Sequence, residues 1–141
     1  MKDQLETFTI QFANVFPASC QLHLMWDHTA VIIPVTADVT SRVVANIDEA
    51  MKGEKKPYFQ AAEYYYDNGL DLNKALTWIN EAEKTTPNSY SVKLWKARIL
   101  LKKGDKAAAL ATAQEGARLA KEAKTEEYVR LNEAVIKQAK S

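Results

Sequence analysis

The stretch that decides the fold is Tyr58–Lys121, with the sequence YFQAAEYYYDNGLDLNKALTWINEAEKTTPNSYSVKLWKARILLKKGDKAAALATAQEGARLAK. Like residues recur in it at offsets of 34 or 35 positions: Ala75 and Ala109, Leu76 and Leu110, Ala62 and Ala97, Gly69 and Gly104. Within the first copy, Tyr58, Ala61, Ala62 and Tyr65 fall on one face of a helix. The pattern therefore predicts two copies of one helical hairpin.

The repeat length and its small residues resemble those of the tetratricopeptide repeat. The matching positions are Tyr58, Ala61, Ala62, Tyr65, Ala75, Ile79, Ala82 and Pro87 in the first copy, and Ala97, Leu100, Gly104, Ala109, Ala113 and Gly116 in the second. The second copy departs from the pattern at Lys93 and Lys96, where large or apolar residues usually stand, and at Lys121, which replaces the final proline. The alternative is a run of ordinary amphipathic helices without a true repeat.

In a repeat of this type, the first helix of each hairpin lines a concave groove. The register places eight residues there: Phe59, Glu63, Tyr66, Asp67, Leu94, Arg98, Leu101 and Lys102. We expect these residues to form the binding surface. The alternative is that Glu63 and Asp67 pair with Arg98 and Lys102 across the groove, which would leave no free charge for a ligand. Each such surface pair contributes at most about 1 kcal/mol.

Composition limits the classes of function. The chain has 141 residues, 47% of them hydrophobic, and a formal charge of +1, so it has no global attraction to nucleic acid. Residues from Tyr90 onward hold 12 of the 19 basic and 6 of the 18 acidic side chains, but aromatic residues are not interleaved with them. No apolar run approaches the roughly 20 residues of a membrane span. The single cysteine excludes an internal disulfide.

Ahead of the repeat, the alternation of apolar and polar residues predicts a small antiparallel meander. Its strands are Leu5–Phe12, Cys20–Trp26 and Ala30–Val35, with residues 14–19 as a connection. Pro34 has no N–H to donate, so the third strand should lie at an edge. The sheet has apolar residues on both faces, and its outer edge at Leu5–Phe12 is open to pairing with another strand.

After Thr40, which is predicted to be an N-cap, the spacing of the apolar residues becomes helical. Thr125 is expected to cap the start of a last helix, and Glu126 and Glu127 suit its N-terminus. This helix is expected to cover the exposed face of the last repeat. The fold class predicted is α+β: a three-stranded antiparallel sheet followed by a helical repeat array. The predicted division is 1–38 for the sheet, 39–53 for a connecting helix and 54–141 for the helical domain.

The order of the motifs resembles the C-terminal half of the bacterial family called domain of unknown function 2911. The segments that carry the resemblance are Phe8-Thr9-Ile10, Leu22-His23-Leu24-Met25-Trp26-Asp27, Val31–Val35, Ala45-Asn46-Ile47, Ala61-Ala62-Glu63-Tyr64, Leu72-Asn73-Lys74-Ala75-Leu76-Thr77-Trp78 and Lys96-Ala97-Arg98. In that family a β-rich region and usually an export signal precede this half. The resemblance therefore implies a part of a longer periplasmic or secreted protein, although no signal peptide heads this chain, and it implies no activity.

Residues with reactive or metal-binding side chains are few. Cys20, His23, Asp27 and His28 are the one cluster of metal-ligand types, but Cys20 and His23 lie three apart on a strand and so point to opposite faces. Neighbouring carboxylates at Asp48-Glu49 and Glu126-Glu127 diverge on a helix. No phosphate-binding glycine loop or serine elbow is present. We therefore expect no catalytic residues, metal or cofactor.

The interpretation that follows is a non-enzymatic module that binds a protein or peptide, not nucleic acid, with a homodimer through the edge strand Leu5–Phe12 as a further expectation. One alternative is a structural accessory half that completes an upstream β-domain. Another is an enzyme or metal protein that uses Cys20, His23 and His28.

Overall fold

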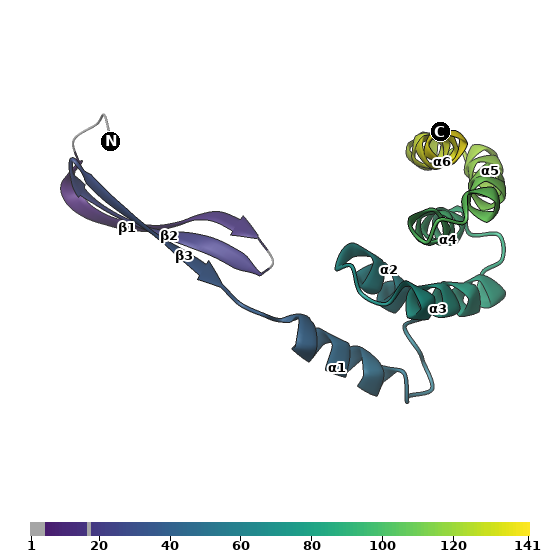
Figure 1. Cartoon of the computed structure of the whole chain (residues 1–141), viewed down its shortest axis with the longest axis horizontal. Helices are drawn as coiled ribbons and strands as arrows, with labels where there is room; N and C mark the ends of the chain where they lie inside the picture. Colours follow the sequence, from purple (N-terminus) through teal and green to yellow (C-terminus); the bar gives the residue numbers. More distant parts are fainter. Residues whose placement is uncertain (1–4, 17) are drawn as a thin grey trace. The chain divides into compact units, whose positions relative to one another are not determined.

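A computed structural model describes residues 5–16 and 18–141 of the chain, and it confirms the α+β class. In order, the elements are β1 Leu5–Phe16, β2 Ser19–Asp27, β3 Thr29–Thr36, α1 Thr40–Ala50, α2 Tyr58–Asp67, α3 Leu72–Thr85, α4 Tyr90–Lys102, α5 Lys106–Glu122 and α6 Glu126–Lys140 (Figure 1). The chain divides into two compact units, Met1–Asp48 and Glu49–Ser141. The predicted three-part division stays a prediction.

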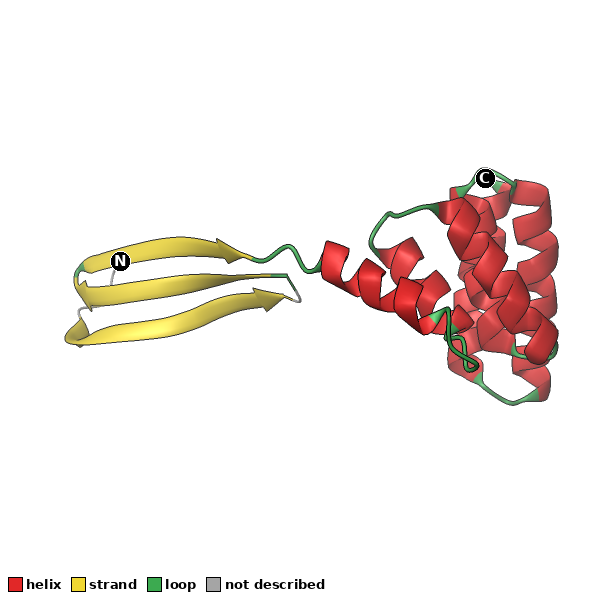
Figure 2. Ribbon diagram, turned by 90° about the horizontal axis from the view of Figure 1, so that it is seen from below, coloured by secondary structure: helices red, strands yellow, loops and turns green. Residues whose placement is uncertain are grey.

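The sheet of the first unit is the expected meander, with strand order β1-β2-β3 and both pairings antiparallel (Figure 2). Pro34 lies in an edge strand opposite Gln21, as its missing donor requires. The prediction for the first connection was wrong, because β1 continues to Phe16. The reason is a register irregularity between Ala13 and Phe16, where Asn14 adopts a positive φ of 49° and the strand still pairs beyond it.

Helix α1 follows the sheet and begins at Thr40. The residue that caps it is Asp38, whose Oδ1 accepts a hydrogen bond from the Thr40 backbone N–H at 3.0 Å. Thr40, the predicted N-cap, is therefore the first residue of the helix. Val43, Val44 and Ile47 remain partly exposed along one side of α1, and none of its residues is buried.

In the second unit, α2, α4 and α6 lie on one side and α3 and α5 on the other (Figure 1). Residues separated by one repeat occupy like environments. Ala62, Ala97 and Asn132 follow each other at intervals of 35 and are all fully buried, and so are Ala75 and Ala109 at an interval of 34. Small side chains at these positions allow neighbouring helix backbones to approach closely. The predicted offset is thus present in the packing, and it extends into α6.

The loops that end α2, α4 and α5 repeat one hydrogen-bond pattern. After α4, the N–H of Gly104 donates to the Leu101 carbonyl and the N–H of Asp105 donates to the Leu100 carbonyl, both at 3.0 Å. Gly69 and Lys124 occupy the same place after α2 and α5. All three residues have a positive φ, of 64°, 91° and 56° in chain order. This is the Schellman ending, in which glycine is favoured because a Cβ destabilises the left-handed conformation.

Lys124 is the one of these three residues that has a Cβ. We expect Lys124→Gly to raise the free energy of unfolding of the helical unit by about 1 kcal/mol, because it removes the steric penalty of the left-handed conformation. Gly104→Ala is the matched control, since a Cβ there meets no atom within 4 Å and acts through the backbone alone. It should lower the free energy of unfolding by about 1 kcal/mol. Urea unfolding followed by circular dichroism measures both changes. If the two substitutions changed the free energy of unfolding in the same direction, the Schellman ending at Lys124 would be contradicted.

The N-termini of the second helices also repeat. Asp71 accepts hydrogen bonds from the N–H groups of Asn73 and Lys74, and Asp105 accepts one from Ala108, so each aspartate caps its helix. Thr125 was expected to cap α6 in the same way. It does occupy the N-cap position, but its side chain makes no capping bond and instead donates to the Ala123 carbonyl.

Lys93 and Lys96, the predicted departures from the repeat pattern, share one carboxylate. Their Nζ atoms lie 2.7 and 2.6 Å from the two oxygens of Glu83 on α3, and all three side chains are about one-fifth exposed. Partial burial acts to raise the pKa of Glu83, but hydrogen bonds and charges from the two lysines outweigh it and hold the pKa below its ordinary value of 4.5. The cluster joins the end of the first hairpin to the start of the second.

Glu83→Gln is expected to lower the free energy of unfolding by about 1 to 2 kcal/mol at pH 7, because two partly buried ammonium groups lose their carboxylate. The pKa of Glu83 is lower in the folded protein than its ordinary value of 4.5, so the ionised carboxylate stabilises the folded state above pH 4.5. This stabilisation is lost as the pH falls through the pKa of the folded protein. In urea unfolding, the difference between wild type and variant should therefore be largest well above pH 4.5 and shrink as the pH falls below 4.5.

The matched control is Glu81→Gln, which breaks the exposed pair of Glu81 with Lys84 on the same helix. Its expected effect is below about 0.5 kcal/mol. A pH-independent loss in Glu83→Gln, or an equal loss in both variants, would show that the lysine–glutamate cluster does not stabilise the junction.

Candidate functional site

A hollow of about 440 Å³ lies between α2, α4 and α6. We call this hollow the groove pocket. It is lined by Tyr66, Arg98, Leu101, Lys102, Leu131, Ala134, Val135 and Gln138. Four of them, Tyr66, Arg98, Leu101 and Lys102, belong to the eight residues that the sequence register placed in a groove. The helical spacing explains the grouping, because Arg98 and Lys102, like Leu131 and Val135, are four residues apart and share a face.

The two cations of the groove pocket rest on aromatic rings. The guanidinium carbon of Arg98 is 4.8 Å from the centre of the Trp95 ring, and Lys102 Nζ is 4.5 Å from the centre of the Tyr66 ring. The Tyr66 and Trp95 rings meet edge to face at 5.5 Å, and Lys102 Nζ also donates to the Tyr66 carbonyl at 3.0 Å. These contacts fix the orientation of both cations without neutralising their charge.

The lining of the groove pocket contains two positive charges and no carboxylate. In the described part of the chain, no ion pair joins Glu63 or Asp67 to Arg98 or Lys102, so the structure does not contain the alternative pairs across the groove. Burial raises the pKa of Glu63, repulsion from Asp67 adds to the increase, and attraction to Arg98 partly opposes it. The guanidinium of Arg98 therefore keeps hydrogen-bond donors for an external acceptor.

The other predicted groove residues lie elsewhere. Leu94 is 1% exposed and packs in a core cluster with Ala97, Ala113 and Val135, so it offers no surface to a ligand. Glu63 is partly buried on α2 and Asp67 is exposed at its end. Phe59 lines a different hollow.

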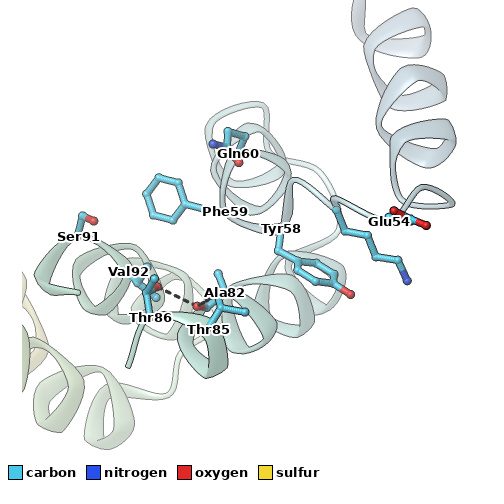
Figure 3. A pocket seen from close by; sticks show the side chains of 10 residues that line it. Glu54, Tyr58, Phe59, Gln60, Ala82, Thr85, Thr86, Ser91 and Val92 are labelled. Atoms are coloured by element: carbon cyan, nitrogen blue, oxygen red, sulfur yellow. Dashed lines mark hydrogen bonds between the residues drawn. The ribbon is translucent and has the colours of Figure 1, made fainter. Parts of the chain in front are cut away.

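This second hollow, of about 630 Å³, lies where α2 and α4 begin and α3 ends. Figure 3 shows Phe59 projecting from α2 toward the start of α4, where Ser91 and Val92 lie. The hydroxyls of Thr85 and Thr86 both donate to the Ala82 carbonyl, at 2.8 and 3.0 Å, so these donors are already engaged. Its charged lining residues are Glu54 and Lys56, which come from the loop before α2. The groove pocket is the better candidate site, because its charges are held in place by helices.

The cysteine and histidines of the sheet do not converge. Cys20 pairs with Val35 while His23 lies between Gln11 and Ile32 in the register, so the two side chains occupy opposite faces of β2. His23 Nε2 is 3.1 Å from Gln21 Oε1, and His28 Nε2 is 3.8 Å from Asp27 Oδ1. Among the described residues, no group of three or more His, Cys, Asp or Glu side chains is placed to hold a metal ion.

The sequence reasoning missed the α6 side of the groove pocket. Leu131, Ala134, Val135 and Gln138 were assigned to a capping helix, although α6 packs against α4 as α4 packs against α2. The signal was available in the spacing, because Asn132 follows Ala97 by the 35 residues that separate Ala97 from Ala62. The third copy is not evident from residue types, because Asn132 carries an amide where Ala62 and Ala97 carry a methyl group.

No protein-family model, curated protein or solved structure matches the chain. Within residues 5–16 and 18–141, none of the helices has both the length and the apolar character needed to cross a membrane.

Proposed function

We propose that the second unit is a non-enzymatic, tetratricopeptide-like module that binds a peptide segment in the groove pocket. The observation that supports it most strongly is the pair of ring-supported cations, Arg98 and Lys102, at a hollow without a carboxylate. Groove-lining residues from three successive first helices are the arrangement that repeat proteins use to bind extended segments. The chain also resembles the domain of unknown function 2911 family, whose members usually carry an export signal. The proposal therefore includes that the module is part of a periplasmic or secreted protein.

The lining also specifies the ligand chemistry. Leu101 and Leu131 supply an apolar wall beside the two cations, and Gln138 supplies an amide. A guanidinium binds a carboxylate through two parallel hydrogen bonds, and such charge-assisted bonds are the stronger kind. We infer that the preferred ligand is a peptide in which a carboxylate, from a side chain or a C-terminus, stands next to an apolar side chain.

An array of random dodecapeptides probed with the labelled full chain tests this proposal. Bound peptides should be enriched in aspartate and glutamate next to leucine, isoleucine or phenylalanine. Arg98→Ala/Lys102→Ala should weaken binding of the best peptides at least tenfold, because each charged hydrogen bond contributes about 1.5 to 3 kcal/mol. Circular dichroism would verify that the variant keeps its helices.

The matched control is Lys137→Ala/Lys140→Ala, which removes the same charge from exposed positions of α6 outside the groove pocket. This variant should bind the peptides as wild type does. An array without enrichment, or an equal loss in the two double variants, would contradict a specific site at Arg98 and Lys102.

A further inference from the structure

One face of the sheet is apolar across all three strands. The register aligns Ile10 with Leu24 and Val31, and Phe12 with Leu22 and Ile33, so these six side chains lie on the same face. Phe8 and Trp26 continue it, with ring centres 5.7 Å apart. We call this set the apolar face. No member of it is charged.

The opposite face of the sheet is mixed. Gln11, Gln21 and His23 lie there, and Gln21 accepts a hydrogen bond from Asn14, but Ile32 lies there too and is 54% exposed. The apolar face differs from it in being apolar on all three strands at each of the aligned positions above, so it is the side with the stronger need of a cover.

The apolar face is open in the first unit. Phe8, Ile10 and Phe12 are 57%, 60% and 69% exposed, and Val31 and Ile33 are 41% and 40% exposed. An isolated three-stranded sheet needs a packed layer on its hydrophobic face to be stable. Contiguous exposed apolar areas of this size mark interaction surfaces.

The area suits a dimer. With aromatic side chains that bury about 150–250 Å² each and aliphatic ones somewhat less, the exposed fractions give roughly 700 Å² for the apolar face. Two such faces together give roughly 1,400 Å², which lies within the range of about 1,200–2,000 Å² for stable interfaces. The partner must be uncharged, apolar and of similar extent, and a second copy of this face meets all three conditions.

The face is also complementary to itself in shape. Its two phenylalanines, Phe8 and Phe12, stand on β1 at one edge, whereas its members on β3 at the other edge, Val31 and Ile33, have smaller side chains without a ring. A two-fold axis along β2 places β1 of each copy opposite β3 of its partner, so large side chains meet small ones in both halves of the interface. Sheets packed in this way lie about 10 Å apart.

We infer that two copies of this chain pack their apolar faces together, forming a six-stranded β-sandwich with a two-fold axis along β2. This pairing is independent of the groove pocket. It differs from the edge-to-edge dimer through β1 that the sequence suggests, because the strands of the two copies stack and do not hydrogen-bond to each other.

Sedimentation equilibrium of the full chain from 1 to 200 µM tests the inference. The expected mass is twice the 15.9 kDa of one chain. Ile10→Glu/Phe12→Glu, on the apolar face, should shift the chain to a monomer, whereas Thr9→Glu/Gln11→Glu, on the opposite face of the same strand, should leave the dimer intact. Circular dichroism would verify that the helical unit remains folded in both variants.

Cys20, the single cysteine, serves as an internal reporter because it lies on β2 next to the proposed axis, opposite Val35. The two copies of Cys20 should be joined by a bis-maleimide with a spacer of about 8 Å, since the sheets lie about 10 Å apart. Ile10→Glu/Phe12→Glu should abolish this cross-link. A monomeric wild type overturns the inference, and so does a dimer that survives Ile10→Glu/Phe12→Glu.

Discussion

Replacing Leu94 by alanine is expected to lower the free energy of unfolding by about 3 kcal/mol, because it leaves a cavity in a packed core. Leu94 is 1% exposed and contacts Ala97, Ala113 and Val135, which come from three successive helices. The loss should appear in urea unfolding followed by circular dichroism. The slope of the free energy of unfolding against urea concentration should stay unchanged.

Leu101→Ala is the matched control on the same helix, since Leu101 is only partly buried and lines the groove pocket. Its expected loss is about 1 kcal/mol, in proportion to the smaller apolar area that it buries. If both substitutions lowered the free energy of unfolding equally, Leu94 would not be the better packed of the two residues, contrary to its burial. Leu101→Ala should in addition weaken peptide binding, because it removes part of the apolar wall.

A second large effect is expected at Gly116 of α5, which lies against Asn132 of α6. A Cβ on Gly116 would lie 2.4 Å from Asn132 Oδ1, 2.9 Å from its Cγ and 3.1 Å from Lys93 Cβ. Asn132 is completely buried, so it has no free space into which to turn. Gly116→Ala should lower the free energy of unfolding by about 1 to 2 kcal/mol, because overpacking outweighs the higher helix propensity of alanine.

The sign of this effect should reverse when Asn132 is also shortened. The Asn132 amide N–H donates to the Tyr128 carbonyl, but its Oδ1 has no hydrogen-bond partner in the described structure. In an Asn132→Ala background the clashing side-chain atoms are gone, so Gly116→Ala should raise the free energy of unfolding by about 1 kcal/mol through helix propensity. The resulting coupling energy of about 2 to 3 kcal/mol is measurable in a double-mutant cycle. Additive effects would show that the two residues do not touch.

The sequence patterns predicted most of the secondary structure for reasons that are local. Alternation in the strands, Pro34 at an edge, and glycine after α2 and α4 depend on neighbouring residues alone. The strand end was missed because Asn14 and Pro17 are typical of turns, whereas β1 passes Asn14 by an irregularity in its pairing with β2. Pro17 itself lies outside the described residues.

The site was harder to predict, since it depends on which side of each helix faces its neighbours. Leu94 was placed in the groove because α4 has apolar residues around much of its circumference, and α4 in fact buries Val92, Leu94, Ala97, Ile99 and Leu100. Its periodicity therefore cannot identify one exposed side. Lys93 and Lys96 looked like departures from the repeat for a similar reason, because their partner Glu83 lies on another helix.

Whether the groove pocket holds a carboxylate beside an apolar side chain is tested most directly by NMR titration of the full chain with N-acetyl-leucine. The Arg98 Nε–H signal and the methyl signals of Leu101 and Leu131 should shift together and saturate, with a Kd on the order of millimolar for so small a ligand. N-acetyl-leucinamide, which has the same side chain and no charge, should bind at least fivefold more weakly. Equal shifts with the two probes, or shifts that avoid Arg98 and Leu131, would contradict a peptide-carboxylate site in this groove.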